Sequence, residues 1–223
     1  MNTAKFHDVF QPEKATARIH IIGCGAVGSL LAETIARMGF TNITLYDFDV
    51  VCSHNIANQL YVESDVGKLK VDALAERLLA INPDLKLSLK LKKEGYTNQI
   101  LSGYIFLCVD NIDLRRQIAE ANRLNPNIRF VTDFRMRLWD AQIFAADWTD
   151  EKAVTSLLNS MQFTHDEAKE ETPVSACNLT LSVIPTVWNV VSLGVANFMN
   201  YINNGMYKKI IYNYPFEPQV ESY

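Results

Sequence analysis

Residues 18–29 read R-I-H-I-I-G-C-G-A-V-G-S and join a short apolar run to a turn with three glycines. Such a G-x-G-x-x-G turn between a strand and a helix binds phosphate groups. Gly23 permits the tight turn, Gly25 lets the backbone approach a phosphate, and Gly28 allows the helix to pack closely on the strand. Apolar residues at helical spacing follow, so we predict a nucleotide-binding Rossmann-type unit rather than a structural glycine turn.

The next predicted strand, residues 43–47, ends in Asp47, about twenty residues beyond the glycines. A carboxylate at this place can accept hydrogen bonds from the hydroxyls of a ribose. NAD, FAD and ATP all carry a ribose, so this residue alone does not choose among the nucleotides.

The remaining patterns alternate between helix and strand. We predict helices over residues 68–81 and 111–124, an exposed or edge strand over 85–91, a buried parallel strand over 104–109, and further strands over 129–132 and 137–145. This order predicts an α/β fold, a Rossmann-type doubly wound and mostly parallel sheet. Asp110 directly follows the buried strand, at the edge of the sheet where such folds bind ligands.

Length and composition favour one cytoplasmic domain. The chain has 223 residues, 48% of them hydrophobic, and a net charge of −4. Basic residues are scattered, so nucleic-acid binding is not expected, and no leader or membrane segment is predicted; residues 179–202 are interpreted as a buried helix. The four cysteines include no C-x-x-C pair, so no zinc site is expected.

Four short motifs then occur in order: D-F-D at 47–49, N-I-A-N-Q at 55–59, D-V-G-K-L-K at 65–70 and C-V-D-N at 108–111. Together they resemble the ThiF/MoeB/HesA family, bacterial relatives of ubiquitin-activating enzymes that adenylate the C-terminal carboxylate of a small protein or another acid. The resemblance covers residues 18–144 strongly, as a nucleotide-binding core. It implies a single adenylation domain over 1–223, with a crossover loop over 147–177 and an antiparallel C-terminal extension, a helix and a strand, over 178–223.

The resemblance also implies a site for ATP and Mg²⁺. Asp47 would bind the ribose, the glycine turn the phosphates, and Lys70 would neutralise charge near the α-phosphate. Asp110 would hold Mg²⁺, a hard cation that prefers oxygen ligands. Asp49 and Asn55 would orient the surrounding loop. Alternatively, Lys70 is a solvated helix lysine like Lys68, and Asp110 is an N-cap of the next helix.

The stretch at 147–174 is acidic and poor in apolar residues after Phe163, so we predict a mobile surface loop. Cys177 follows it, just before the long apolar helix, where a helix dipole would favour a thiolate. We treat Cys177 as a candidate nucleophile for a thioester step, with simple packing as the alternative. Cys24 and Cys108 are interpreted as packing residues.

One position departs from the family pattern. Asn58 stands where the family has an arginine expected to contact the ATP phosphates, and no second arginine precedes Arg18. Three functions therefore stay open: adenylation of a ubiquitin-like or sulfur-carrier protein or a related acid, a degenerate binding or scaffold subunit, and an NAD-dependent oxidoreductase. Peptide modification and tRNA-base dehydration are compatible with the first.

The resemblance further implies a homodimer or a pairing with a homologous subunit. The apolar surface predicted to form the contact comprises the long helix over 179–202 and a face carrying Trp139, Trp148 and Trp188.

Overall fold

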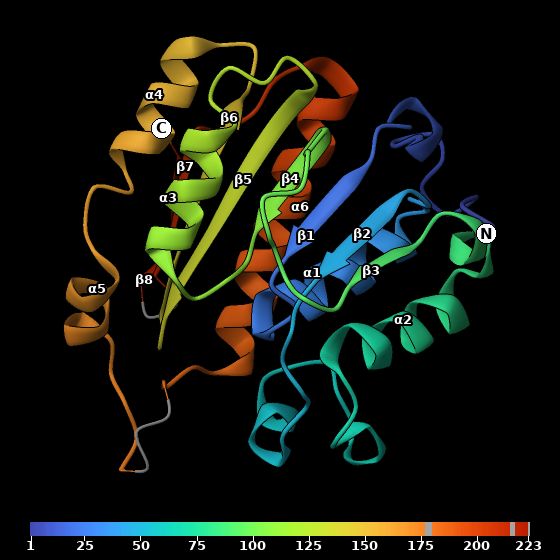
Figure 1. Ribbon diagram of the computed structural model, residues 1–223. Helices are drawn as coiled ribbons and strands as arrows, with labels where there is room; N and C mark the ends of the chain where they lie inside the picture. Colours follow the sequence, from blue (N-terminus) through green and yellow to red (C-terminus); the bar gives the residue numbers. More distant parts are fainter. Residues whose placement is uncertain (177–179, 215–216, 223) are drawn as a thin grey trace.

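The computed structural model describes residues 1–176, 180–214 and 217–222. Its centre is one eight-stranded sheet in the order β3-β2-β1-β4-β5-β6-β7-β8 (Figure 1). The first five strands in the chain pair in parallel: β1 (Ile19–Ile22), β2 (Ile43–Tyr46), β3 (Lys90–Lys92), β4 (Gly103–Leu107) and β5 (Ile128–Arg137). The last three pair antiparallel: β6 (Asp140–Asp147), β7 (Ile210–Tyr214) and β8 (Glu217–Ser222). The predicted fold class is confirmed.

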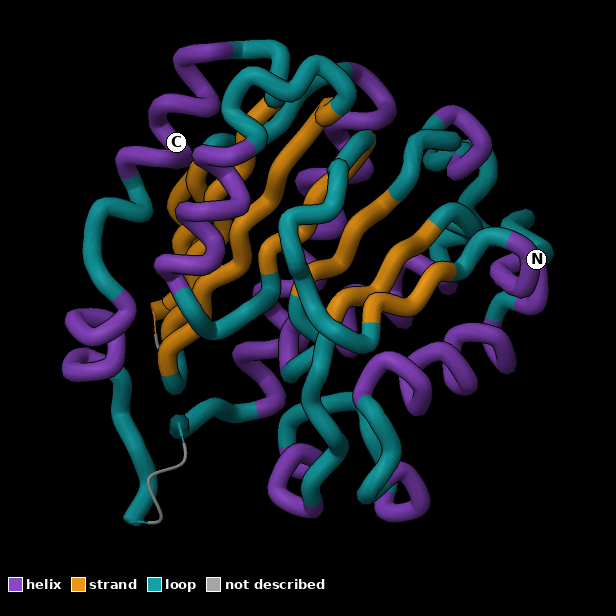
Figure 2. The backbone as a smooth tube through the Cα atoms, in the orientation of Figure 1, coloured by secondary structure: helices purple, strands orange, loops and turns teal. Residues whose placement is uncertain are grey.

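Helices cover both faces of the sheet (Figure 2). One face carries α1 (Ala26–Arg37), α2 (Lys70–Ile81) and α6 (Ile184–Asn204), and the other carries α3 (Ile112–Ala121) and α4 (Glu151–Asn159), with the short α5 (His165–Glu171) beyond them. Phe198 of α6 meets Tyr104, Phe106 and Phe130 with ring centroids 4.9, 5.0 and 6.2 Å away. The central strands are thus buried on both faces, which explains their continuous apolar sequences.

The strand register brings three chain segments to one edge of the sheet. Ile22 lies opposite both Tyr46 and Leu107, and Leu107 lies opposite Asp133. The residues that follow β1, β2 and β4 therefore meet at the carboxyl edge. Strand β5 continues to Arg137 and returns as β6 through a turn in which Leu138 has a φ of 42°. The strand predicted at 137–145 is therefore the second arm of this hairpin, with Arg137 still in the first.

The strand predicted over 85–91 is mostly wrong. A 3-10 turn occupies Pro83–Leu87, and only Lys90–Lys92 pairs with β2. Asn82 caps the turn by accepting a hydrogen bond from the Asp84 amide. Leu87 is 97% exposed, so the alternating leucines do not share a buried face.

The mobile loop predicted over 147–174 is also wrong, because α4 and α5 occupy much of it. The Asp150 side chain caps α4 at Lys152, and α4 buries apolar residues at helical spacing, namely Ala153, Val154, Leu157 and Leu158. Thr164 and Glu167 cap α5 reciprocally. The acidic stretch therefore forms two short helices, α4 with an apolar face and α5 with a capped start.

The long C-terminal helix begins at Ile184, later than predicted, with Pro185 in its first turn. Gly205 ends it with a φ of 74°, and two strands follow rather than one. Trp148 is buried and donates to the Asn122 carbonyl, so only Trp139 and Trp188 of the predicted apolar face are exposed. Among the helices of the described ranges, none has the length and apolarity needed to cross a membrane.

Candidate functional site at the carboxyl edge of the sheet

The glycine turn after β1 is packed tightly at two glycines and open at the third. Gly23 has a φ of 97°, and a Cβ there would lie 2.7 Å from the Val109 nitrogen. A Cβ at Gly28 would lie 1.8 Å from the Gly23 carbonyl oxygen. At Gly25 a Cβ would meet no described atom within 4 Å, and no described side chain caps the start of α1. The turn therefore leaves room and helix N-terminal amides for an anion, as phosphate binding requires.

Asp47 joins the end of β2 to this turn. Its Oδ2 accepts a hydrogen bond from the Cys24 amide at 2.6 Å, and its Oδ1 accepts one from the Asp49 amide at 2.8 Å. The residue is half-buried, and a carboxylate has further lone pairs for ribose hydroxyls. Asp47 thus lies beside the turn, where ribose binding requires it.

Lys70 begins α2 and is withdrawn from solvent, with 7% of its surface exposed. Its Nζ lies 2.7 Å from Oδ2 of Asp49, and its amide donates to the Asp49 carbonyl. Lys68 instead lies partly exposed and pairs with Asp65 and Glu76, which raise its pKa by hydrogen bonding. The interpretation of Lys70 as a solvated lysine like Lys68 is therefore wrong.

Tyr61, which the sequence analysis did not single out, links the two halves of this site. Its buried hydroxyl donates to the Cys24 carbonyl at 2.7 Å and lies 3.4 Å from the Lys70 carbonyl oxygen. Burial strongly raises the pKa of this phenol, so it remains a neutral donor. A single tyrosine outside the recognised motifs gave no signal by which this link could be found.

Asp110 is exposed at the end of the segment that follows β4. The N-cap of α3 is Asn111, whose side chain accepts from the Leu114 amide at 3.0 Å. The alternative of Asp110 as N-cap is therefore wrong, and its carboxylate has no hydrogen-bond or ion-pair partner among the described residues. One such carboxylate suits Mg²⁺, which is usually bound by one or two carboxylates together with substrate phosphates and water.

A structural metal site needs a closed set of protein ligands. No group of three or more His, Cys, Asp or Glu side chains gathers in the described part of the chain.

The two asparagines have structural partners. Oδ1 of Asn55 accepts from the Cys52 amide at 2.9 Å and thus shapes the 3-10 turn Ser53–Ala57. The Asn58 amide group donates to the Ser182 hydroxyl, which ties this turn to the segment before α6. Asn58 is therefore engaged with protein atoms at the place where the resemblance implies an arginine for phosphate.

The Cys24 side chain is buried and that of Cys108 is half-buried. Cys177 lies outside the described residues, and α6 begins only at Ile184, so the helix does not start directly after Cys177. Burial raises the pKa of Cys24 and of Cys108, which favours neutral, packed thiols.

A buried ion cluster at the same edge was also missed. Asp133 is fully buried at the end of the parallel part of β5, and it pairs with Arg115 of α3 and with Arg135 at 2.6 Å each. Arg115 lies in the helix predicted over 111–124, and no signal in the sequence connects it with Asp133.

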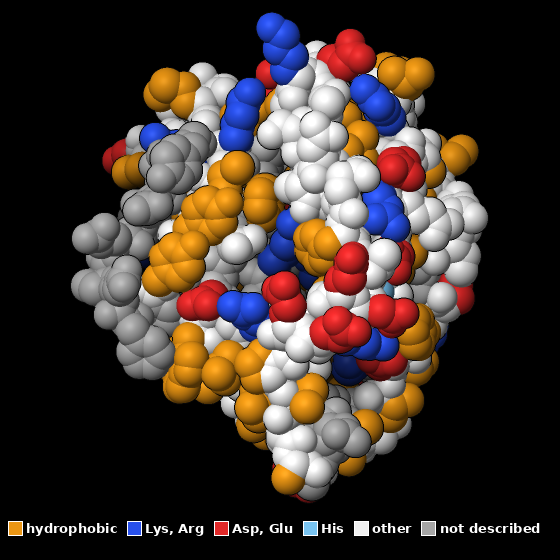
Figure 3. All heavy atoms as spheres, turned by 90° about the vertical axis from the view of Figure 1, so that its left-hand side faces the viewer, with side chains coloured by type: hydrophobic (Ala, Val, Ile, Leu, Met, Phe, Trp, Pro, Cys, Tyr) orange, Lys and Arg blue, Asp and Glu red, His pale blue; other side chains and the backbone are white. Residues whose placement is uncertain are grey.

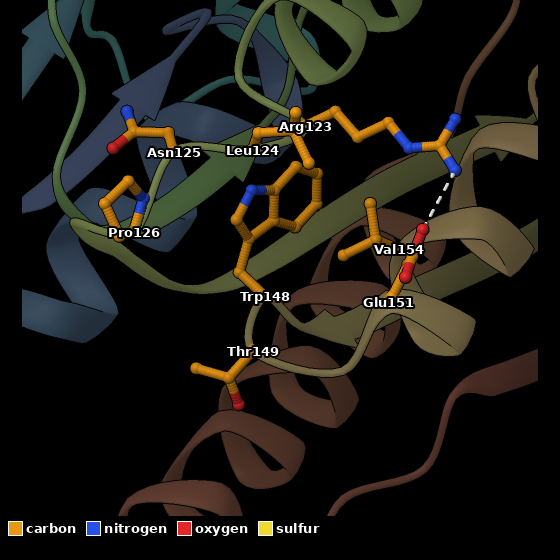
Figure 4. A pocket seen from close by; sticks show the side chains of 8 residues that line it. All are labelled: Arg123, Leu124, Asn125, Pro126, Trp148, Thr149, Glu151 and Val154. Atoms are coloured by element: carbon orange, nitrogen blue, oxygen red, sulfur yellow. Dashed lines mark ion pairs between the residues drawn. The ribbon is translucent and has the colours of Figure 1, made fainter.

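A separate pocket of about 210 Å³ lies at the opposite edge of the sheet (Figure 4). It is lined by the segment between α3 and β5 and by the start of α4, and the Trp148 side chain lies between these two segments. Arg123 and Glu151 form an ion pair of 3.7 Å across the pocket lining. This pocket is remote from the glycine turn. On the face shown in Figure 3, basic and acidic side chains lie interspersed, without a continuous basic surface.

Known proteins share part of this sequence. The sequence is 32% identical over 118 residues to a tRNA threonylcarbamoyladenosine dehydratase of Haemophilus influenzae, covering 49% of this chain and 45% of that protein. It is 31% identical over 107 residues to the molybdopterin-synthase adenylyltransferase of Salmonella typhimurium, covering 46% and 43%. The chain thus matches less than half the length of these relatives.

Solved structures share the fold. E. coli MccB, solved with MccA-N7isoASN, has a TM-score of 0.70 at 17% identity, covering 95% of this chain and 66% of its own. PaaA has a TM-score of 0.71 at 17% identity, covering 95% and 65%. The model of the ThiF family matches residues 1–204. With that match over most of its length, the chain belongs to the ThiF family.

Proposed function

We propose that this protein activates a carboxylate by ATP-dependent adenylation. The observation that supports this most is the pairing of buried Lys70 with Asp49 beside a glycine turn that is open at Gly25. A buried, oriented ammonium group next to a phosphate-binding turn can neutralise charge that develops during displacement at phosphorus. On the neighbouring strand end, Asp110 presents a carboxylate without a described partner.

The reaction needs little covalent chemistry from the protein. An oxygen of the acceptor carboxylate bonds to the α-phosphorus of ATP, and the bond from that phosphorus to its bridging oxygen breaks, so that pyrophosphate leaves. Asp47 orients the ribose, the amides of the glycine turn hold the phosphates, and Lys70 neutralises the α-phosphate. Mg²⁺, held by Asp110 and the nucleotide, would supply further charge neutralisation.

We propose a carboxylate of a polypeptide as the acceptor, the C-terminus of a ubiquitin-like or sulfur-carrier protein or a related acid. Relatives include proteins named molybdopterin-synthase adenylyltransferase and ubiquitin-like modifier-activating enzyme 5, and the MccB fold was solved with a MccA peptide. Another relative is named for a tRNA nucleoside, so a related acid on tRNA belongs to the test set.

Calorimetry with ATP·Mg²⁺ and with NAD, followed by pyrophosphate exchange with candidate acceptors, tests the proposal. ATP·Mg²⁺ should bind and exchange should depend on an acceptor. Tighter binding of NAD than of ATP would replace this proposal with an oxidoreductase.

A second function, a binding or scaffold subunit, is favoured by Asn58. The resemblance implies an arginine that contacts phosphate at this position, whereas Asn58 forms a hydrogen bond with Ser182. Arginine binds phosphate oxygens with a fixed geometry that asparagine lacks. ATP binding without exchange, for every acceptor offered, would select this function.

A thioester step and a dimer complete the proposal. The Cys177 thiolate would attack the acyl-adenylate carbonyl, with AMP leaving; Cys177→Ala should then lose the thioester and keep pyrophosphate exchange. Labelling by iodoacetamide no faster than that of Cys24 would assign the thiol to packing.

Exposed Trp139 and Trp188 support a homodimer or a paired homologous subunit. A monomer at micromolar concentration in light scattering would contradict the homodimer.

A further inference from the structure

The Arg115 guanidinium donates hydrogen bonds to the main chain immediately before Asp110. It is 7% exposed, and its Nε donates to the Val109 carbonyl at 2.6 Å, with Nη2 donating to the same oxygen. The Val109 nitrogen, on the other side of this residue, lies against Gly23, 2.7 Å from the place of a Cβ there. Val109 is thus held between the glycine turn and the Arg115 guanidinium.

Asp133 holds Arg115 in turn. Its Oδ1 accepts from Nη1 of Arg115 and its Oδ2 from Nε of Arg135, both at 2.6 Å. The carboxylate is fully buried, so each oxygen needs such a partner. Two guanidinium groups around one carboxylate leave the cluster with a surplus of one positive charge at the carboxyl edge.

Arg135 extends the cluster to α4. Its Nη1 and Nη2 donate to the carbonyl and the hydroxyl of Ser160 at 2.8 Å each, and its guanidinium lies 4.1 Å from the centroid of the Phe144 ring. Ser160 is the C-cap of α4. A continuous set of contacts therefore leads from the end of α4 to the residue before Asp110.

We propose that Arg115, held by Asp133 and Arg135, is a positioning residue that sets the place of the Asp110 carboxylate. Among the described residues no side chain forms a hydrogen bond or an ion pair with that carboxylate, so its place depends on its backbone. Asp113 and Arg116, which pair at 2.7 Å on the same helix, lie nearer to solvent, and their side chains form no hydrogen bond with Val109. The effect on the nucleotide site rests on the proposed function, whereas the positioning itself does not.

The first experiment uses the protein without nucleotide and compares Arg115→Lys with the matched control Arg116→Lys. Lysine keeps the charge beside Asp133 but lacks the fork that reaches Val109. Amide hydrogen exchange over residues 107–114 should accelerate about tenfold in Arg115→Lys and change less than about twofold in the control. Equal exchange in the two variants would overturn the proposal. If Arg115→Lys does not fold, Arg135→Lys replaces it, with a smaller acceleration expected.

The second experiment titrates Mg²⁺ into each variant with ATP present. Arg115→Lys should need about tenfold more Mg²⁺ for half-maximal binding, because the loss of a residue that orients a metal ligand typically lowers metal affinity by about that factor or more. Asp110→Asn should abolish the Mg²⁺ dependence, and adding Arg115→Lys to it should change nothing further. If Arg115→Lys loses the same ATP affinity with and without Mg²⁺, Arg115 stabilises the fold and does not position Asp110. If the unmodified protein binds no ATP·Mg²⁺, the proposed function fails and the exchange experiment alone decides the positioning.

Discussion

The nucleotide side of the carboxyl edge and the β5–β6 side are built by different kinds of contact. Around the glycine turn, Asp47 directly follows β2 and Lys70 begins α2, and Asp47 reaches the turn at Cys24 within a single β-α-β unit. On the other side, Asp133 depends on α3, and Asn58 depends on Ser182, which is far away in the sequence. Short motifs therefore describe the first region, whereas the second exists only once distant segments pack together.

The largest expected effect concerns the buried cluster. Asp133→Ala should lower the free energy of unfolding by about 3–5 kcal/mol, because it leaves two buried guanidinium groups without their carboxylate. Asp113→Ala, which breaks the more exposed pair with Arg116, should cost less than about 1 kcal/mol. Urea denaturation of both variants measures the difference. Equal costs would contradict the contrast between a buried and an exposed pair.

The glycine turn provides a matched test within one motif. Gly28→Ala should cost roughly 3 kcal/mol in urea denaturation, because the new Cβ would collide with the Gly23 carbonyl. Gly25→Ala should leave stability within about 0.5 kcal/mol, since the Cβ would enter open space, but it should weaken ATP binding. If both variants unfold alike, the turn is packed throughout and lacks room for a phosphate.

Buried His20 on the parallel strand β1 predicts that folding stability depends on pH. Burial lowers the pKa of this residue to about 4, below the 6.5 of an exposed histidine. The unfolded chain therefore takes up a proton first as the pH falls, and folding stability should drop by about 2 kcal/mol between pH 7 and pH 5. Denaturation across this range measures the slope, and His20→Asn should remove it. A slope that persists in that variant would assign it to other groups.

The smallest expected effect separates two neighbouring lysines. Lys70→Ala should weaken ATP·Mg²⁺ binding about tenfold, through loss of a buried cation beside the turn, and Lys68→Ala less than about twofold. Calorimetry on both variants provides the comparison. Matching losses would mean that the burial of Lys70 serves only its pair with Asp49.

Much of the fold followed from local patterns. The apolar run of β4 and the glycine turn after β1 specify their own elements, because burial on both faces and tight turns restrict residue types locally. The alternating leucines at 85–91 misled, since a proline turn capped by Asn82 competes with a strand. The acidic stretch misled too, since the apolar face of α4 becomes visible only against β6.

The site divides in the same way. The sequence by itself determined the glycine turn after β1, the place of Asp47 after the next strand, and the order of Lys70 and Asp110, because each follows a recognisable strand or motif. Only the tertiary structure decided that Lys70 is buried while Lys68 is not, that Asn58 is engaged by Ser182, and that Asp133 joins two arginines. The physical reason is that burial and ion pairing depend on which distant segments exclude water from a side chain, and Asn58 and Asp133 each have a partner that lies outside any short window of sequence.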